Sequence, residues 1–187
     1  FKAAGYEQVD KNGKVSLEKD GVQLRIEVGI PGGGTMDHPT APVLTQMKTE
    51  MEKMGAVLEI TDTDGQVFMD RLDAADWQMW VAAWQATVDP DMYQTYYSTG
   101  PSNHYKIKNE ELDKLIIDAR QTNDIEVRKD YYSKALDIIM DEAVEMPVYQ
   151  RKNMNVFNQE IVDMESLPEN MTPYYTYFAE VETLRLK

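Results

Sequence analysis

The order of strand-like and helix-like patterns in the first third of the chain restricts its fold more than any other feature. Residues 22–30, VQLRIEVGI, place apolar side chains at every second position, which predicts a strand. From about Thr40, apolar residues recur at spacings of three and four, which predicts a helix that ends at Gly55. AVLEI then predicts a second strand. This order favours an α/β fold with parallel strands.

Local signals place the remaining elements. Asn12-Gly13 and Asp20-Gly21 predict the turns of a hairpin before the first strand. WQMWVAAW (77–84) and MPVYQRKNMNVF (146–157) are interpreted as further strands, and the first of them as central or ligand-facing, because it is apolar on both faces. The tail from residue 161 is not placed.

Three more helices are predicted from capping residues and apolar spacing. Asp64 is expected to cap a short helix, and Asn109 a longer one. The last helix is expected from about residue 125 to 143. Its predicted buried side consists of Tyr131, Ala135, Ile138 and Ile139.

Composition excludes several classes of function. Nineteen basic and 33 acidic residues give a net charge of −14, which argues against nucleic-acid partners because these are bound largely through Lys and Arg. The absence of cysteine excludes disulfides and thiolate metal sites. The sequence contains no run of about 18 apolar residues, so it predicts no membrane-spanning helix. We expect no cofactor.

Few residues suggest catalysis or metal binding. His38 and His104 are far apart in loop-like sequence without the spacing of a zinc site, so no metal is expected. Asp89 and Asp91 could form the carboxylate pair of a glycoside hydrolase. The simpler interpretation, which we favour, is that Asp-Pro-Asp caps a helix near Pro90.

All three tryptophans lie within residues 77–84. On an extended strand, Trp77 would point away from Trp80 and Trp84, because odd spacings place side chains on opposite faces. One set could then pack in the core while the other lines a cleft, since indoles combine large contact area with a polar group. A purely structural role for all three is an equally open interpretation.

Two longer stretches, DAADWQMWVAAWQATVDPDMYQTYYSTG and NEELDKLIIDARQTNDIEVRKDYYSKALDIIMDEAVEMPVY, resemble extracytoplasmic solute-binding proteins of the oligopeptide and dipeptide type (family 5), which serve ABC importers. The resemblance continues upstream through AAGYEQVDKNGKVSLEKDGVQLRIEV and MEKMGAVLEI. Members of this family are longer and clamp a ligand between two lobes. The resemblance implies one lobe of a periplasmic-binding-protein-like (type II) fold, with a mixed sheet flanked by helices.

On this resemblance, residues 1–160 are expected to form the second lobe, and residues 161–187 a return segment that crosses to the missing first lobe. The implied function is non-catalytic capture of short peptides for a membrane permease, by a monomer outside the cytoplasm, in the periplasm or at the cell surface through an upstream lipid anchor. The alternatives are an oligosaccharide or other small solute, or a carbohydrate hydrolase that uses Asp89 or Asp91.

The resemblance also implies ligand-binding residues. Backbone groups of Ala83 and Gln85 would bond an extended peptide, and Trp84 corresponds to the pocket tryptophan. Tyr93 follows on the next helix. Peptide binders often carry an aspartate three residues after this tryptophan, but Thr87 stands here, so Asp89 is the candidate to pair with the ligand's amino group.

Overall fold

The computed structural model describes residues 1–84, 87–150, 152, 154–172 and 174–187. The chain divides into two compact units, which are described separately. The first comprises Phe1–Gln85 and Met92–Lys114, and the second Ala86–Asp91 and Leu115–Lys187. In the described part of the chain, no helix has the length and apolar character needed to cross a membrane.

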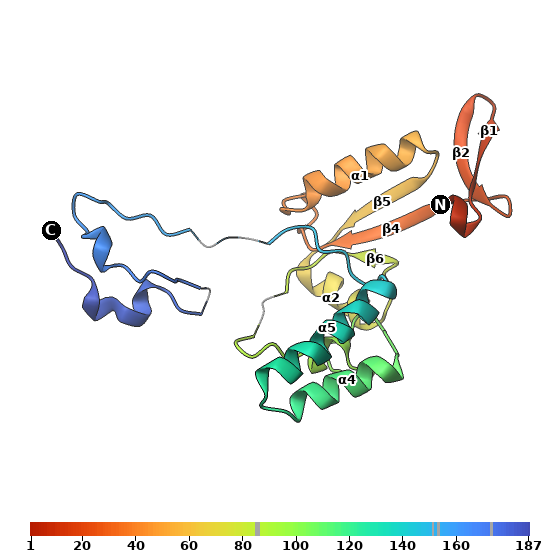
Figure 1. The fold of residues 1–187 in the computed structure, drawn as a ribbon. Helices are drawn as coiled ribbons and strands as arrows, with labels where there is room; N and C mark the ends of the chain where they lie inside the picture. The colour runs from red at the N-terminus through yellow and green to blue at the C-terminus, as the bar shows by residue number, and fades with distance from the viewer. Residues whose placement is uncertain (85–86, 151, 153, 173) are drawn as a thin grey trace. The chain divides into compact units, whose positions relative to one another are not determined.

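The first unit begins with the predicted hairpin (Figure 1). After η1 (Lys2–Ala4), strands β1 (Glu7–Lys11), β2 (Lys14–Lys19) and β3 (Val22–Gln23) form an antiparallel sheet in that order. Asn12 and Gly13 have φ values of 57° and 81°, as a two-residue turn with both central residues left-handed requires. Asp20 and Gly21 repeat this conformation at the second turn.

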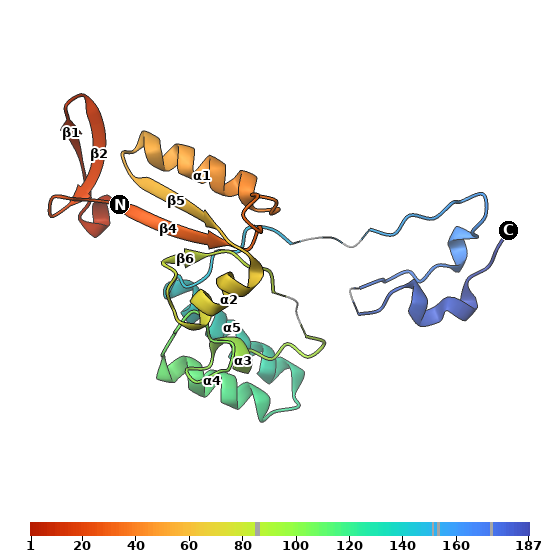
Figure 2. The same cartoon turned by 180° about the vertical axis from the view of Figure 1, so that it is seen from behind.

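The second sheet of this unit carries the core. β4 (Arg25–Ile30) lies between β5 (Val57–Asp62) and β6 (Met79–Trp80), and both pairings are parallel. Helix α1 (Ala41–Lys53) joins β4 to β5 and packs along β5, as both ribbon views show (Figures 1 and 2). The buried cluster between helix and sheet includes Val28, Ile30, Leu44, Met51 and Leu58. The α/β prediction is confirmed, with parallel and antiparallel strands in two separate sheets.

Two predicted strands differ from the structure. The single strand predicted over residues 22–30 is split at Leu24, whose N–H donates to Leu17 in the first sheet while its carbonyl accepts from Val57 in the second. Val22, predicted on the buried face, is 69% exposed. The strand predicted over residues 77–84 is restricted to β6, because only Met79 and Trp80 pair with β4.

The first unit continues with two short helices and the beginning of a longer one. In α2 (Gly65–Asp73), the Asp64 carboxylate accepts from the N–H groups of Gln66 and Val67, so the predicted cap is confirmed. After α3 (Tyr93–Tyr96), α4 (Glu110–Arg120) begins where Asn109 accepts from two amides of its first turn, as predicted.

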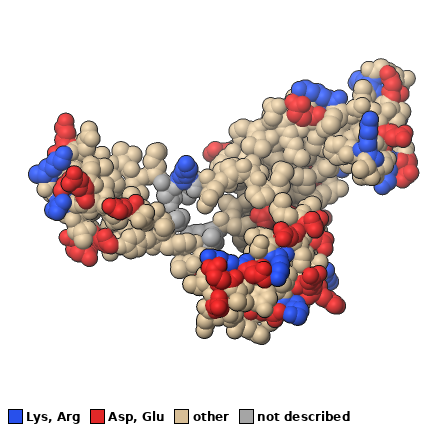
Figure 3. Space-filling model, in the orientation of Figure 1, with Lys and Arg blue, Asp and Glu red and all other residues tan. Residues whose placement is uncertain are grey.

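In the second unit, the end of α4 and α5 (Ile125–Asp141) provide the buried residues, and Asp124 caps α5. Tyr132 is buried in α5 with Ala135 and Ile139, so the prediction of Tyr131 was one residue off. The opposite side of α5 is solvated, and Lys129 and Lys134 pair with acidic residues one turn away. Figure 3 shows acidic and basic side chains interspersed over this helical region.

The remaining residues of this unit have little regular structure. The described residues of 146–157 form no strand, contrary to the prediction. Two 3-10 segments follow, η2 (Met164–Ser166) and η3 (Tyr177–Thr183), and Val162 makes an isolated antiparallel bridge with Leu186. The lobe boundary expected at residue 160 stays a prediction.

Candidate ligand-binding site

The segment that carries the tryptophans packs against the central strand β4 through Trp77. The indole lies flat over Gly29 of β4, where an added Cβ would come within 2.6 Å of the ring. Its Nε1 donates to the carbonyl of Phe68 at 3.2 Å, and only 9% of the residue is exposed. Gly29 is therefore required for close approach of a side chain, not for a turn.

Arg71 of α2 covers the other side of this indole, with its Cζ 3.4 Å from the ring centroid. The guanidinium donates to both carboxylate oxygens of Glu27, at 3.1 and 3.0 Å, and to Asp76 at 2.9 Å. Arg71 and a second donor, Thr61, hold the pKa of Glu27 below its ordinary value, and Glu27 in turn raises the pKa of Arg71. The ion pairs of Arg71 with Glu27 and Asp76, which we call the charged clasp, hold the guanidinium against Trp77 between β4 and α2.

Beyond Trp77 the exposure of the tryptophans increases, although Trp80 still packs against the cluster of Phe68, Leu72 and Trp77. Trp80 pairs with Gly29, and the N–H of Val81 donates to the carbonyl of Gly29 at 3.0 Å, after which the chain leaves the sheet. Trp80 is half-buried, whereas Trp84 is 47% exposed. Trp84 is therefore not a core residue of the described chain, and its role in ligand binding stays a prediction.

Five rings form what we call the aromatic platform: Trp80, Trp84, Tyr96, His104 and Tyr105. Trp80 stacks on Tyr105 with centroids 5.2 Å apart, and Tyr105 stacks on Tyr96 at 5.5 Å. Trp84 stacks on His104 at 6.2 Å and donates its Nε1–H to the hydroxyl of Tyr105 at 2.8 Å. The platform thus joins the end of β6 to a loop twenty residues further along the chain.

Asn103 shapes that loop. It is 8% exposed, and its side-chain amide donates to the carbonyls of Tyr97, Ser98 and Ile107 at 3.1, 3.4 and 2.9 Å. Sequence analysis missed this residue and its role in presenting His104. An asparagine directly before an aromatic pair was the available signal, but nothing local indicates which element the pair contacts.

The first unit holds four of the residues predicted to bind ligand, and the structure describes three of them. Ala83 and Trp84 are exposed beyond the end of β6, and Tyr93 begins α3, where it stacks on Tyr97 with centroids 4.5 Å apart. Gln85 lies outside the described residues. The structure places Trp84 against His104, a contact that the prediction did not include.

The second unit contains Thr87 and Asp89. The hydroxyl of Thr87 donates to the backbone carbonyl of Asp89, and the Asp89 carboxylate accepts from Arg128 of α5. Arg128 also contacts the Tyr132 hydroxyl at 3.3 Å, and Tyr132 and Asp89 together raise the pKa of Arg128. With 65% of its side chain exposed, Asp89 is a fixed but accessible carboxylate.

The interpretation of Asp-Pro-Asp as a helix cap was wrong. Helix α3 starts after Met92 without a side-chain cap. Asp91 lies 3.6 Å from Arg120, as Asp89 lies beside Arg128. The two aspartates thus pair with arginines of α4 and α5 within the second unit.

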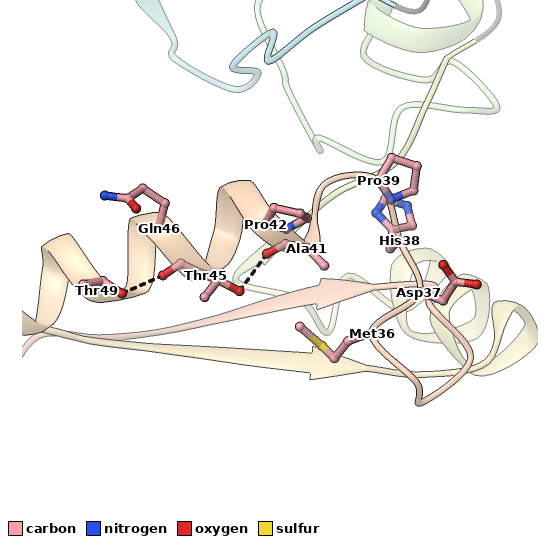
Figure 4. Close-up of a pocket in the computed structure, with 9 residues that line it drawn as sticks. All are labelled: Met36, Asp37, His38, Pro39, Ala41, Pro42, Thr45, Gln46 and Thr49. Atoms are coloured by element: carbon pink, nitrogen blue, oxygen red, sulfur yellow. Dashed lines mark hydrogen bonds between the residues drawn. The ribbon is translucent and has the colours of Figure 1, made fainter.

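A depression in the described surface lies elsewhere, along the start of α1 (Figure 4). It measures about 680 Å³ and contains none of the residues predicted to bind ligand. The hydroxyls of Thr45 and Thr49 bond to helix carbonyls, at 2.8 and 3.0 Å. Among the described residues, no group of three metal-ligating side chains occurs, either here or at His104. Besides Thr45 and Thr49, the polar side chains that line the depression are Asp37, His38 and Gln46.

Comparison with known proteins gives relatives of one kind, although no family model matches. The probable D,D-dipeptide-binding periplasmic protein DdpA of Escherichia coli (strain K12) is 24% identical over 126 residues, or 64% of this chain and 24% of DdpA. The oligopeptide-binding protein AppA of Bacillus subtilis (strain 168) is 24% identical over 174 residues, or 88% of this chain and 29% of AppA. The chain spans about a quarter of the length of these curated relatives.

Solved structures give the same result for the fold. AppA from Bacillus subtilis in complex with a nonapeptide has a TM-score of 0.65 at 21% identity, covering 76% of this chain and 28% of AppA. NikZ from Campylobacter jejuni in complex with Ni(L-His) has a TM-score of 0.60 at 22% identity, covering 76% of this chain and 29% of NikZ. These findings confirm the predicted resemblance and the α/β lobe fold, and the curated relatives are binding proteins rather than enzymes.

Proposed function

Because the chain is related in sequence and fold to solute-binding proteins of the oligopeptide and dipeptide type, we propose that it is part of the substrate-binding component of an ABC importer. The protein captures short peptides outside the cytoplasm and delivers them to a membrane permease, without catalysis. One observation supports this most: Trp84 is 47% exposed, while His104 and Tyr105 of the aromatic platform hold its indole in place. A large ring that is both exposed and held by neighbouring rings is suited to contact with a ligand.

In this proposal the residues from 83 to 93 hold the peptide. The backbone of Ala83 and Gln85 bonds an extended ligand, which is indifferent to the ligand's side chains, while Trp84 and Tyr93 supply apolar contact. The exposure of Ala83 and Trp84 beyond the short strand β6 supports this role. Thr87 and Asp89 provide polar groups for the amino-terminal end of the peptide.

Asp89 is the proposed partner of the ligand's amino group. Arg128 holds its carboxylate in place, and the exposed part of the side chain can accept a further donor. A carboxylate that is already oriented loses less entropy when it binds a cation. We therefore expect Asp89→Asn to weaken binding of a free peptide more than binding of the same peptide with an acetylated amino terminus.

The test is a ligand screen followed by calorimetry, on the protein at its natural length. Thermal shift against pools of peptides, oligosaccharides and nickel–histidine complexes identifies the solute, since a ligand that binds the folded state raises the Tm. Stabilisation by peptides is expected. Stabilisation only by sugars or metal complexes would replace peptides with that class, and turnover of an oligosaccharide abolished by Asp89→Asn or Asp91→Asn would show a hydrolase.

Calorimetry then tests the site. Replacement of Trp84 by alanine should weaken peptide binding about 30-fold, because truncation of a central tryptophan typically costs about 2 kcal/mol. Val22→Ala, at a 69% exposed position on β3, is the control and should leave the affinity unchanged. An unchanged affinity in the Trp84 variant would contradict the proposed site.

A further inference from the structure

His104 occupies a distinctive position behind Trp84. Its imidazole stacks on the Trp84 indole, with centroids 6.2 Å apart and ring planes inclined by 20°, and it meets Trp80 edge-on at 6.4 Å. Only 13% of the histidine side chain is exposed. The imidazole therefore lies offset against an indole that is itself 47% exposed, so that part of the indole is shielded and part is open to solvent.

The histidine is itself held in place. Its Nδ1 lies 3.5 Å from the Asp73 carboxylate at the end of α2. The backbone N–H of His104 donates to the carbonyl of Ser102 at 2.8 Å, and the buried Asn103 fixes the loop that carries His104. An imidazole held on both its backbone and its ring is a rigid support, unlike a side chain free to change rotamer.

The next residue fixes the same indole in a second direction. The Tyr105 hydroxyl accepts the Trp84 Nε1–H at 2.8 Å, while its ring stacks on Trp80. One contact sets the plane of the indole and the other sets its rotation within that plane. Consecutive residues 104 and 105 thus determine how a ring twenty residues earlier is presented.

We infer that His104 is a positioning residue for ligand capture: it contacts the Trp84 indole so that the exposed part of the ring is already oriented when the ligand arrives. The statement about ligand rests on the proposed function. The position of the indole does not, because it is a property of the free protein. Preorganising one large side chain saves the ordering cost of that side chain, which corresponds to about 2- to 10-fold in affinity.

The test compares His104→Ala with His104→Phe, because phenylalanine keeps a flat ring and removes the hydrogen-bonding groups. In the protein at its natural length, acrylamide quenching of tryptophan fluorescence reports access to the indole without any ligand. Quenching should increase in H104A and return towards the wild-type value in H104F. Peptide affinity should fall about 2- to 10-fold in H104A and recover in H104F.

His38→Ala is the matched control, since His38 is the other histidine of the chain and also lies in the first unit. It should change neither quenching nor affinity. If H104A does not fold, H104Q takes its place, because glutamine keeps bulk without a flat ring. The Tm of both variants is measured, and the affinity loss in H104A should exceed what its loss of Tm accounts for.

Three results would overturn the inference. Quenching that is equal in wild type and H104A would mean that the imidazole does not cover the indole. Failure of H104F to restore quenching and affinity would reduce His104 to a structural residue, as would an affinity loss fully matched by a loss of Tm. If no peptide binds the wild type, the proposed function fails, and the quenching comparison alone decides the positioning role.

Discussion

A single methyl group on Gly29 should test how the tryptophan segment is attached. In Gly29→Ala the new Cβ would lie 2.6–2.7 Å from three atoms of the Trp77 indole. Arg71, whose Cζ lies 3.4 Å from the ring centroid on its other side, prevents the indole from moving away freely. Either the indole or the strand must therefore shift.

The expected cost follows from typical overpacking. Inserting a methyl group into a packed site costs about 1–3 kcal/mol, and the reduced entropy of the unfolded chain offsets about 0.4–1 kcal/mol of it. We expect a net destabilisation of about 1–2 kcal/mol. For a chain of 187 residues, this corresponds to a Tm decrease of about 2–8 °C.

Urea unfolding followed by tryptophan fluorescence and by far-UV circular dichroism measures the difference. Gly65→Ala is the matched control: no atom lies within 4 Å of its added Cβ, and the residue begins α2 with an ordinary backbone conformation. It should be neutral or slightly stabilising. If G29A and G65A agree within about 0.5 kcal/mol, the indole does not rest on Gly29 and the described seat is wrong.

Three further outcomes are expected. Arg71→Lys should lower the free energy of unfolding by about 1–2 kcal/mol, because lysine cannot bond both oxygens of Glu27; equal stability by urea unfolding would contradict the clasp. Asn109→Ala should cost about 1 kcal/mol through loss of the α4 cap, and an unchanged urea midpoint would refute that cap. Burial acts to raise the pKa of Asp62, but the amides of Met36, Gly34 and Gly32 outweigh it, so the pKa lies below 3.8. Asp62 thus stabilises the fold above about pH 4, and this stabilisation is lost as the pH falls through the lower folded-state pKa. Thermal unfolding from pH 5 to 2 should show a smaller stability loss in Asp62→Asn than in the wild type; equal losses would show that Asp62 is not responsible.

Elements with local signals could be predicted from sequence. Asp64 and Asn109 cap their helices because a short polar side chain reaches amides two and three residues ahead, and this depends on nothing distant. The split at Leu24 could not be predicted in this way. The apolar alternation of residues 22–30 continues across both sheets. Only the hydrogen-bond partners of Leu24, which are Leu17 in the first sheet and Val57 in the second, separate the two strands.

The candidate site divides in the same manner. The odd spacings predicted that Trp77 faces away from Trp80 and Trp84 on an extended strand, and the exposures of Trp77 and Trp84 are 9% and 47%. The strand ends at Trp80, however, and Trp80 packs against the same cluster as Trp77, so the spacing argument does not hold for this pair. The support from His104 and Tyr105 depends on a contact across about twenty residues, to which no periodicity refers. The Tyr131 error has a similar origin, since adjacent tyrosines on a helix differ only by about 100°.

The brevity of β6 has a consequence for how such a protein can change. Only two of its residues pair with β4, and the hydrophobic cluster beneath α1 involves none of the exposed positions that follow. If Ala83 and Trp84 bind ligand as we propose, substitutions there would change the ligand that is bound without disturbing the cluster beneath α1. On the proposed function, variation of these two positions with the Trp77 anchor preserved would let one scaffold bind a different solute.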